Sequence, residues 1–328
     1  MAIVNSSQDG TSTTSMFGAT NEFSNVTFRG VADAGMGLKA EAFIDLGLYD
    51  RSGGAQFTRE LYVGLKSEEA GSLRLGRQLT PLFLAAATNE VNGAPAAAGG
   101  LEGVLAIVLN NGVRDARRDN TIQYVSPSIS GVTFNAQSTQ ATNIAYFGNA
   151  AGVPVSADQT TIDTLHFIEV GTSYGYGLSY SAGPFAAQYQ VEKTKDESIL
   201  EYIAQDAAGA QAATTAGDTT TRSVLAFSYD FGMARAHYMH GTAKHTALDV
   251  KGDYYGIAVP MGAITLTASM YTASSNDGTD TSKANGTLYK LNYALSKKTN
   301  AYIISGQDNF STADSKLKTN SFGISHAF

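Results

Sequence analysis

Apolar and polar residues alternate along most of this chain with a period of two, which predicts β-strands. In residues 264–270 one face carries Ile, Leu, Ala and Met, and the other carries Thr, Thr and Ser. Residues 289–295 and 322–328 alternate in the same way, with aromatic residues near the strand ends. Such alternation suits a membrane-spanning β-barrel, but it also suits a soluble sheet with one buried face.

The lengths of the connections favour the barrel. Short turns alternate strictly with longer polar loops, which gives about sixteen antiparallel strands of about ten residues if residues 1–5 form part of one. We expect residues 31–37 to be a turn and residues 5–22, 139–169 and 194–219 to be loops, with a composition that suits a helical turn at 199–204. We expect all the short turns to lie at one end of the sheet, centred near Gly35, Glu69, Ser128, Gly183, Asp230, Gly262 and Lys297.

One connection differs from the rest. After Thr80-Pro81 the strand pattern stops, and it resumes only at residues 121–125. A connection of about forty residues is either disordered or functional. Segment 79–119 carries charge at both ends and two apolar runs, 82–87 and 104–109. Because these runs would be unfavourable in water, we expect the segment to fold back and pack on the inner wall of the barrel.

Composition narrows the class of protein. The chain has 328 residues, no Cys and a net charge of −7. The absence of Cys excludes a disulfide framework and thiolate chemistry. The net negative charge argues against a nucleic-acid partner, which requires a basic face. No apolar run is long enough for a transmembrane helix.

Several segments together resemble Gram-negative general porins, especially those of β-proteobacteria. They are Arg59-Glu-Leu-Tyr-Val-Gly-Leu-Lys66, Gly71-Ser-Leu-Arg-Leu-Gly-Arg-Gln-Leu-Thr-Pro81, Asp119-Asn-Thr-Ile-Gln-Tyr-Val-Ser-Pro127, Tyr293-Ala-Leu-Ser-Lys-Lys-Thr-Asn-Ala-Tyr302 and the closing Gly323-Ile-Ser-His-Ala-Phe328. The loop lacks the Pro-Glu-Phe turn that many members carry.

The resemblance implies the fold and the function. The fold is all-β: residues 1–328 form a single porin domain, a sixteen-stranded antiparallel transmembrane β-barrel. Short turns face the periplasm, long loops face outward, and the third loop, 79–119, folds inward as the constriction. The resemblance also implies a homotrimer in the outer membrane of a Gram-negative bacterium, in contact with lipid and lipopolysaccharide. Its function is passive diffusion of small hydrophilic solutes and ions through a water-filled channel.

Candidate site residues are the charges that such a constriction needs, because charge at a narrow waist discriminates ions by sign. Arginine suits this role because its charge is permanent. Arg74 and Arg77 can face the same side only if their strand bends between them. The expected waist cations are Arg59, Arg74, Arg77, Arg114, Arg117 and Arg118, and the expected loop acids are Glu90, Glu102 and Asp115. More arginines than acids predict a mild preference for anions.

Other chemistry is not indicated. His237 and His240 point to opposite faces of one strand, so we expect no metal site and no cofactor. Two further functions remain open at this point. One is an outer-membrane barrel enzyme such as a lipase, although no nucleophile motif accompanies His166 or His245. The other is a surface β-protein that binds carbohydrate or another protein.

Overall fold

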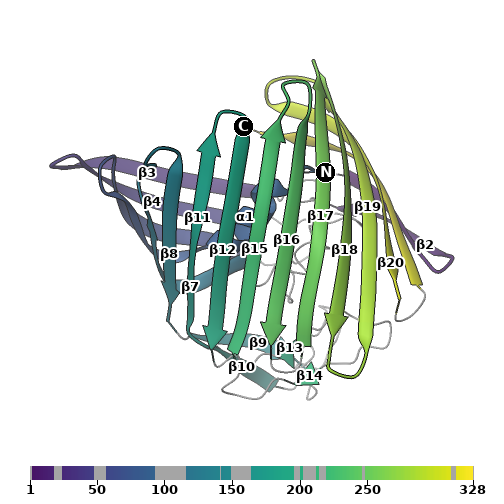
Figure 1. Cartoon of the computed structure of the whole chain (residues 1–328), viewed down its shortest axis with the longest axis horizontal. Helices are drawn as coiled ribbons and strands as arrows, with labels where there is room; N and C mark the ends of the chain where they lie inside the picture. The colour runs from purple at the N-terminus through teal and green to yellow at the C-terminus, as the bar shows by residue number, and fades with distance from the viewer. Residues whose placement is uncertain are drawn as a thin grey trace.

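The computed structural model describes residues 2–17, 24–47, 57–92, 116–140, 142–148, 164–195, 200–201, 212–213, 219–245, 248–311 and 315–327. Nearly all regular structure in these residues is β-strand, and one helix, α1 (Pro81–Asn89), joins them (Figure 1). The strands are β1 (Ala2–Gln8), β2 (Thr11–Phe17), β3 (Asn25–Gly35), β4 (Leu38–Gly47), β5 (Phe57–Ser67), β6 (Gly71–Leu79), β7 (Arg117–Val125), β8 (Val132–Thr139), β9 (Thr142–Gly148), β10 (Thr164–Val170), β11 (Ser173–Ala182), β12 (Phe185–Lys195), β13 (Leu200–Glu201), β14 (Ala212–Ala213), β15 (Thr219–Asp230), β16 (Arg235–His245), β17 (Leu248–Met261), β18 (Ile264–Asn276), β19 (Thr281–Ala294), β20 (Thr299–Phe310) and β21 (Ser315–His326).

Seventeen of these strands form one antiparallel sheet. Neighbours in the sheet follow one another in the order β2, β1, β21, β20, β19, β18, β17, β16, β15, β12, β11, β8, β7, β6, β5, β4 and β3. The first strand therefore pairs with the last, with Asn5 opposite Asn320. Within the described ranges no pairing joins β2 to β3, so these two strands are the edges of the sheet.

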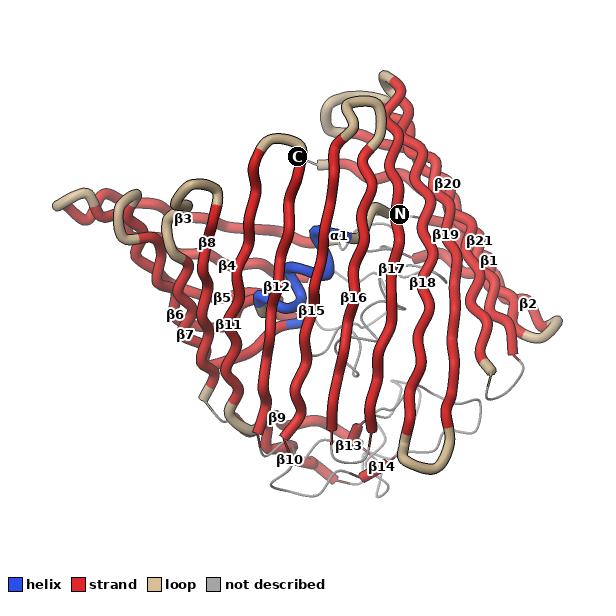
Figure 2. Tube along the Cα trace, viewed as in Figure 1, coloured by secondary structure: helices blue, strands red, loops and turns tan. Residues whose placement is uncertain are grey.

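All seven expected short turns are confirmed. Each connects two consecutive strands that pair in antiparallel register. Antiparallel strands joined in this way place every such turn at the same end of the sheet. The turns of β11–β12, β15–β16 and β17–β18 are seen side by side along the upper rim in Figure 2.

Four expected loops or turns are wrong in part. Residues 11–17 form a strand, β2, so the sheet has seventeen strands rather than sixteen. The β1–β2 hairpin is made by Asp9-Gly10, both with positive φ, a dipeptide that favours such turns.

The loop expected at 139–169 contains the β9–β10 hairpin. β13 lies where a helical turn was expected, and β3 continues to Gly35, leaving only Met36-Gly37 as the turn.

The two faces of the sheet differ in polarity. Large apolar side chains such as Tyr255, Ile257 and Leu291 are exposed on the convex face. Polar side chains such as Gln123 and Thr194 are buried on the concave face, where α1 also lies, between the walls of the curved sheet (Figure 1). A soluble protein does not expose an apolar face of this extent, whereas a barrel in lipid requires one.

Candidate functional site

Arginines and acids meet on the concave side of β3–β7. Arg59 Nε donates to Asp45 Oδ2 at 2.7 Å. Asn25 Nδ2 and Thr27 Oγ1 also donate to Asp45, at 2.6 and 3.3 Å. The Asp45 carboxylate is therefore held by one cation and two neutral donors, which fixes the head group of Arg59.

A second group of charges surrounds Glu41. Arg74 Nε lies 2.8 Å from one carboxylate oxygen of Glu41, and Arg29 lies 3.4 Å from the other. The Arg74 guanidinium also lies over the Tyr62 ring, 4.9 Å from its centre, and Tyr62 stacks on Phe43. Cation–π contact and the ion pair together hold the planar head of Arg74 in one orientation.

Two β-bulges explain how so many charges share this wall. The β4–β5 register shifts after Asp45, so Arg59 is an extra residue between Thr58 and Glu60. The β6–β7 register shifts between Gly76 and Gln78. Gly76 has a φ of +133°, a conformation that favours glycine. These bulges interrupt the alternation of side chains. Residues that a regular strand would point to opposite faces can therefore point to the same face.

The second bulge supplies the bend expected between Arg74 and Arg77. Arg77 Nε donates to the Thr58 carbonyl at 3.0 Å, and its Nη1 lies 3.0 Å from Asp119 Oδ2. The Arg77 side chain is partly exposed, and its charge is balanced by an acid of the strand wall.

The charged residues of β3–β7, called the charged wall below, are joined by a buried cluster of charged residues on β7, β12 and β15. Arg118 Nη2 lies 3.0 Å from Glu192 Oε1, and both side chains are almost fully buried. Thr194 Oγ1 accepts from Arg118 at 3.4 Å and from Arg222 at 3.2 Å. Arg117, the neighbour of Arg118, is buried as well.

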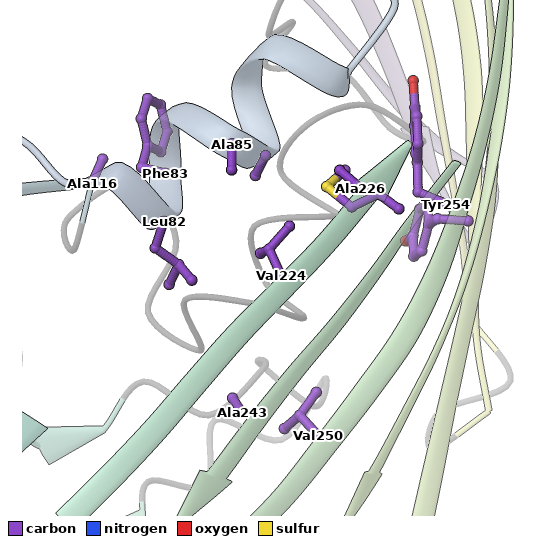
Figure 3. Close-up of a cluster of buried hydrophobic side chains, with 12 residues drawn as sticks. Leu82, Phe83, Ala85, Ala116, Val224, Ala226, Ala243, Val250 and Tyr254 are labelled. Carbon is purple, nitrogen blue, oxygen red and sulfur yellow. The ribbon is translucent and has the colours of Figure 1, made fainter. Parts of the chain in front are cut away.

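The first part of segment 79–119 packs on the concave face. Thr80 caps helix α1 by accepting from the Phe83 N–H at 3.1 Å, and Pro81 opens the helix. α1 contacts β11, β12, β15 and β16. Leu82 and Phe83 join a buried cluster with Val224 and other residues of these strands (Figure 3). The first apolar run, 82–87, thus lies against the inner wall; the second, 104–109, lies outside the described residues.

The expected loop acids are only partly placed. Glu90 follows α1, is buried, and accepts hydrogen bonds from the Tyr254 hydroxyl and from Asn92. Its described partners thus include a side chain of β17. Glu102, Asp115 and the cation Arg114 lie outside the described residues.

Space remains between α1 and the charged wall. A niche of about 200 Å³ opens there. It combines apolar and polar side chains, and its lining includes Leu84, which is 40% exposed on α1. The lining residues are Phe43, Glu60, Tyr62, Arg74, Gln78, Leu79, Leu84 and Gln123.

Several site residues were missed by the sequence analysis. Glu41 and Asp45 lie on the polar face of a strand, which was a usable signal, since a charge inside a barrel strand must face the interior or a partner. Glu192 and Arg222 carry the same signal. No local signal, however, indicates which residues of distant strands they or Tyr254 contact.

Metal binding and helical membrane spans find no support in the described residues. No group of three or more His, Asp or Glu side chains there could hold a metal ion. The single helix found among them, with nine residues, is too short to cross a membrane.

Comparison with known proteins identifies the family. The model of the Gram-negative porin family matches residues 1–313. The chain belongs to the Gram-negative porin family. As a porin, it is an outer-membrane channel protein for passive diffusion and not an enzyme, which removes the lipase and surface-binding alternatives. No curated protein matched the sequence.

Solved structures share the porin fold at low sequence identity. The chain is similar to the anion-selective porin from Comamonas acidovorans, with a TM-score of 0.74 and 19% identity over 100% of this chain and 98% of that one. It is also similar to OmpF of Salmonella typhi, determined with daunomycin, with a TM-score of 0.67 and 12% identity over 99% and 96% of the two chains. The trimer form of OmpT from Vibrio cholerae matches with a TM-score of 0.65 and 13% identity over 99% and 96%.

Proposed function

We propose that this porin is a closed sixteen-stranded barrel whose waist lies between segment 79–119 and the charged wall of β3–β7. Leaving out β2, the sheet contains sixteen strands. In this barrel β1, rather than β2, closes against the free edge of β3, because lipid cannot satisfy an open edge. The short turns face the periplasm, the long loops face outward, and residues 1–328 form a single domain.

The observation that carries this proposal is the path of residues 80–92. This stretch leaves β6 and then contacts β11, β12, β15 and β16 through α1. Its end bonds to Tyr254 of β17, Ser269 of β18 and Lys290 of β19. A chain that starts at one wall and binds the opposite one narrows the passage between them, and the remainder of segment 79–119, with Glu102, Arg114 and Asp115, completes the constriction.

The waist charges favour anions mildly. Among the described residues of β3–β7, arginines outnumber acids near the site: Arg29, Arg59, Arg74, Arg77, Arg117 and Arg118 stand against Glu41, Asp45, Glu60 and Asp119. Such an excess raises the local concentration of anions. The anion selectivity of the Comamonas porin is in keeping with this preference. The permeating solutes are small hydrophilic molecules and ions.

The assembly that we propose is a homotrimer with its interface near the N-terminal strands. The trimer form of Vibrio cholerae OmpT supports it. The exposed apolar side chains of the convex face contact outer-membrane lipid and lipopolysaccharide. A monomer found by mass measurement in mild detergent contradicts this part of the proposal.

Planar-bilayer recording tests the channel function. The purified protein should add discrete conductance steps that scale with the conductivity of the salt solution, as a water-filled pore requires. Liposomes that contain it should admit small sugars faster than larger ones. Absence of conductance steps from protein shown to be folded and heat-modifiable contradicts the proposal.

A further inference from the structure

Three residues after α1 are bound to the wall by an unusually dense set of polar contacts. Asn92 donates from its backbone N–H to both oxygens of Glu90 at 2.9 Å, and Asn92 Nδ2 donates to Glu90 Oε1 at 2.8 Å. The Tyr254 hydroxyl donates to Glu90 Oε1 at 2.9 Å and accepts from the Val91 N–H at the same distance. A single tyrosine hydroxyl of β17 therefore satisfies two groups of this segment.

Two further strands complete the attachment. Asn92 Nδ2 reaches Ser269 Oγ of β18 at 2.7 Å, and the Thr267 hydroxyl donates to Asn92 Oδ1. From β19, Lys290 Nζ donates to the Asn92 carbonyl at 2.7 Å and lies near the Tyr302 ring. Buried amide and carboxylate groups are costly without partners, so this matched set of donors and acceptors favours one position of the segment.

The wall is also shaped to receive the segment. A Cβ atom placed on Gly256 of β17 would lie 2.8 Å from Val91 Cγ1 and 2.9 Å from the Tyr254 hydroxyl. Any side chain at position 256 would therefore press against Val91 and the hydroxyl that binds it. The absence of a side chain here allows the close approach of the two chains.

We propose that residues 90–92 and their seat on β17–β19 form a clasp that holds the constriction loop in one position. Tyr254 and Lys290 are its positioning residues: neither was among the waist charges expected, and both act through residues 90–92. This inference rests on the proposed role of segment 79–119 as the waist. Removing the Tyr254 hydroxyl and the Lys290 ammonium releases the segment while leaving the barrel folded.

The test compares two double variants. Tyr254→Phe with Lys290→Met removes two polar groups of the seat. Tyr271→Phe with Lys283→Met is the matched control, because Tyr271 is an equally buried tyrosine of β18 whose hydroxyl binds Asp308, and Lys283 is an exposed lysine of β19. In a planar bilayer the clasp variant should switch among several conductance levels at voltages where the wild type and the control variant hold one level. A clasp variant as steady as the wild type overturns the proposal.

A second readout does not depend on conductance. Because the natural chain has no Cys, Val91→Cys introduces a unique thiol beside Gly256. A water-soluble maleimide should label this thiol about tenfold or more faster in the clasp variant than in the control variant, as loss of a charge-assisted hydrogen bond predicts. Equal labelling rates contradict the clasp, whether or not the protein conducts.

The clasp and the channel function can be contradicted separately. A wild type without any conductance would contradict the proposed channel function, whereas a conducting wild type with no difference among the variants contradicts the clasp alone.

Discussion

The two walls that face each other across the concave side of this porin are built from different chemistry. The wall of β3–β7 carries ion pairs, including Arg59 with Asp45 and Arg74 with Glu41. The wall of β15–β19 offers apolar side chains to α1 and mostly neutral donors and acceptors to the residues that follow it. We propose that the first wall supplies the electric field and that the second holds the loop that narrows the passage.

This division has a physical reason. Charges beside a water-filled passage remain partly solvated, so their field acts on solutes at a modest cost in stability. A loop that must stay in place needs buried contacts, which apolar packing and fully satisfied hydrogen bonds provide. Because the field and the attachment of the loop come from opposite walls, a substitution can change one without the other. The following variants test that separation.

The largest effect on stability is expected from Glu192. Glu192→Ala leaves Arg118 buried without its carboxylate, and breaking a buried pair in this way costs about 3–5 kcal/mol. Urea unfolding in detergent should show the loss as a lower free energy of unfolding. Asp230→Ala is the control, because its partner Arg235 and Asp230 itself are well exposed at a short turn, where a pair contributes about 0–1 kcal/mol. Equal losses in the two variants would show that the Arg118–Glu192 pair is solvated.

Truncation of Leu82 should loosen the loop without weakening the charged wall. Leu82 is 1% exposed in the cluster with Val224, and Leu82→Ala should cost about 2–5 kcal/mol of local stability. Hydrogen exchange of the α1 amides measures this opening free energy. Leu84→Ala, at an exposed position of the same helix, should change it by only about 0.5 kcal/mol. Equal effects at both positions would contradict the packing of α1 on β15.

The helix cap should have a smaller effect. Thr80→Ala removes the acceptor of the Phe83 N–H, which should cost about 1 kcal/mol. Faster hydrogen exchange at Phe83 and Leu84 measures the loss. Thr80→Ser keeps the hydroxyl and should exchange at nearly the wild-type rate; a serine variant as fast as the alanine variant would show that the cap is not the cause.

The sequence predicts best those features of the structure that depend on residues only a few positions apart. The seven short turns and most strands follow from alternation and turn residues, which act within a few positions. Helix α1 was missed, although Thr80-Pro81 before an apolar run is a helix-start signal. The β2 strand was missed as well, because most of its residues are polar and only Asp9-Gly10 indicates the hairpin.

The site was harder to predict than the fold for a physical reason. Arg59 and Glu60 are neighbours, and only a bulge in the register of β4 and β5 changes which way they point. The carboxylate that binds Arg118 lies on β12, far along the chain, and the partners of Glu90 lie on β17 and in residues after the helix. Residue types alone led to the prediction of a charged waist, but pairing across strands decides which charge meets which.

The central claim is that the charged wall of β3–β7 sets the selectivity of the channel, and reversal potential under a salt gradient tests it most directly. Arg59→Ala with Arg77→Ala removes two cations and leaves Asp45 and Asp119 without these partners. The variant should shift toward cations relative to the wild type, whereas Arg235→Ala, at a short turn, should not. Selectivity and conductance equal to those of the wild type in the double variant would show that these arginines do not line the waist.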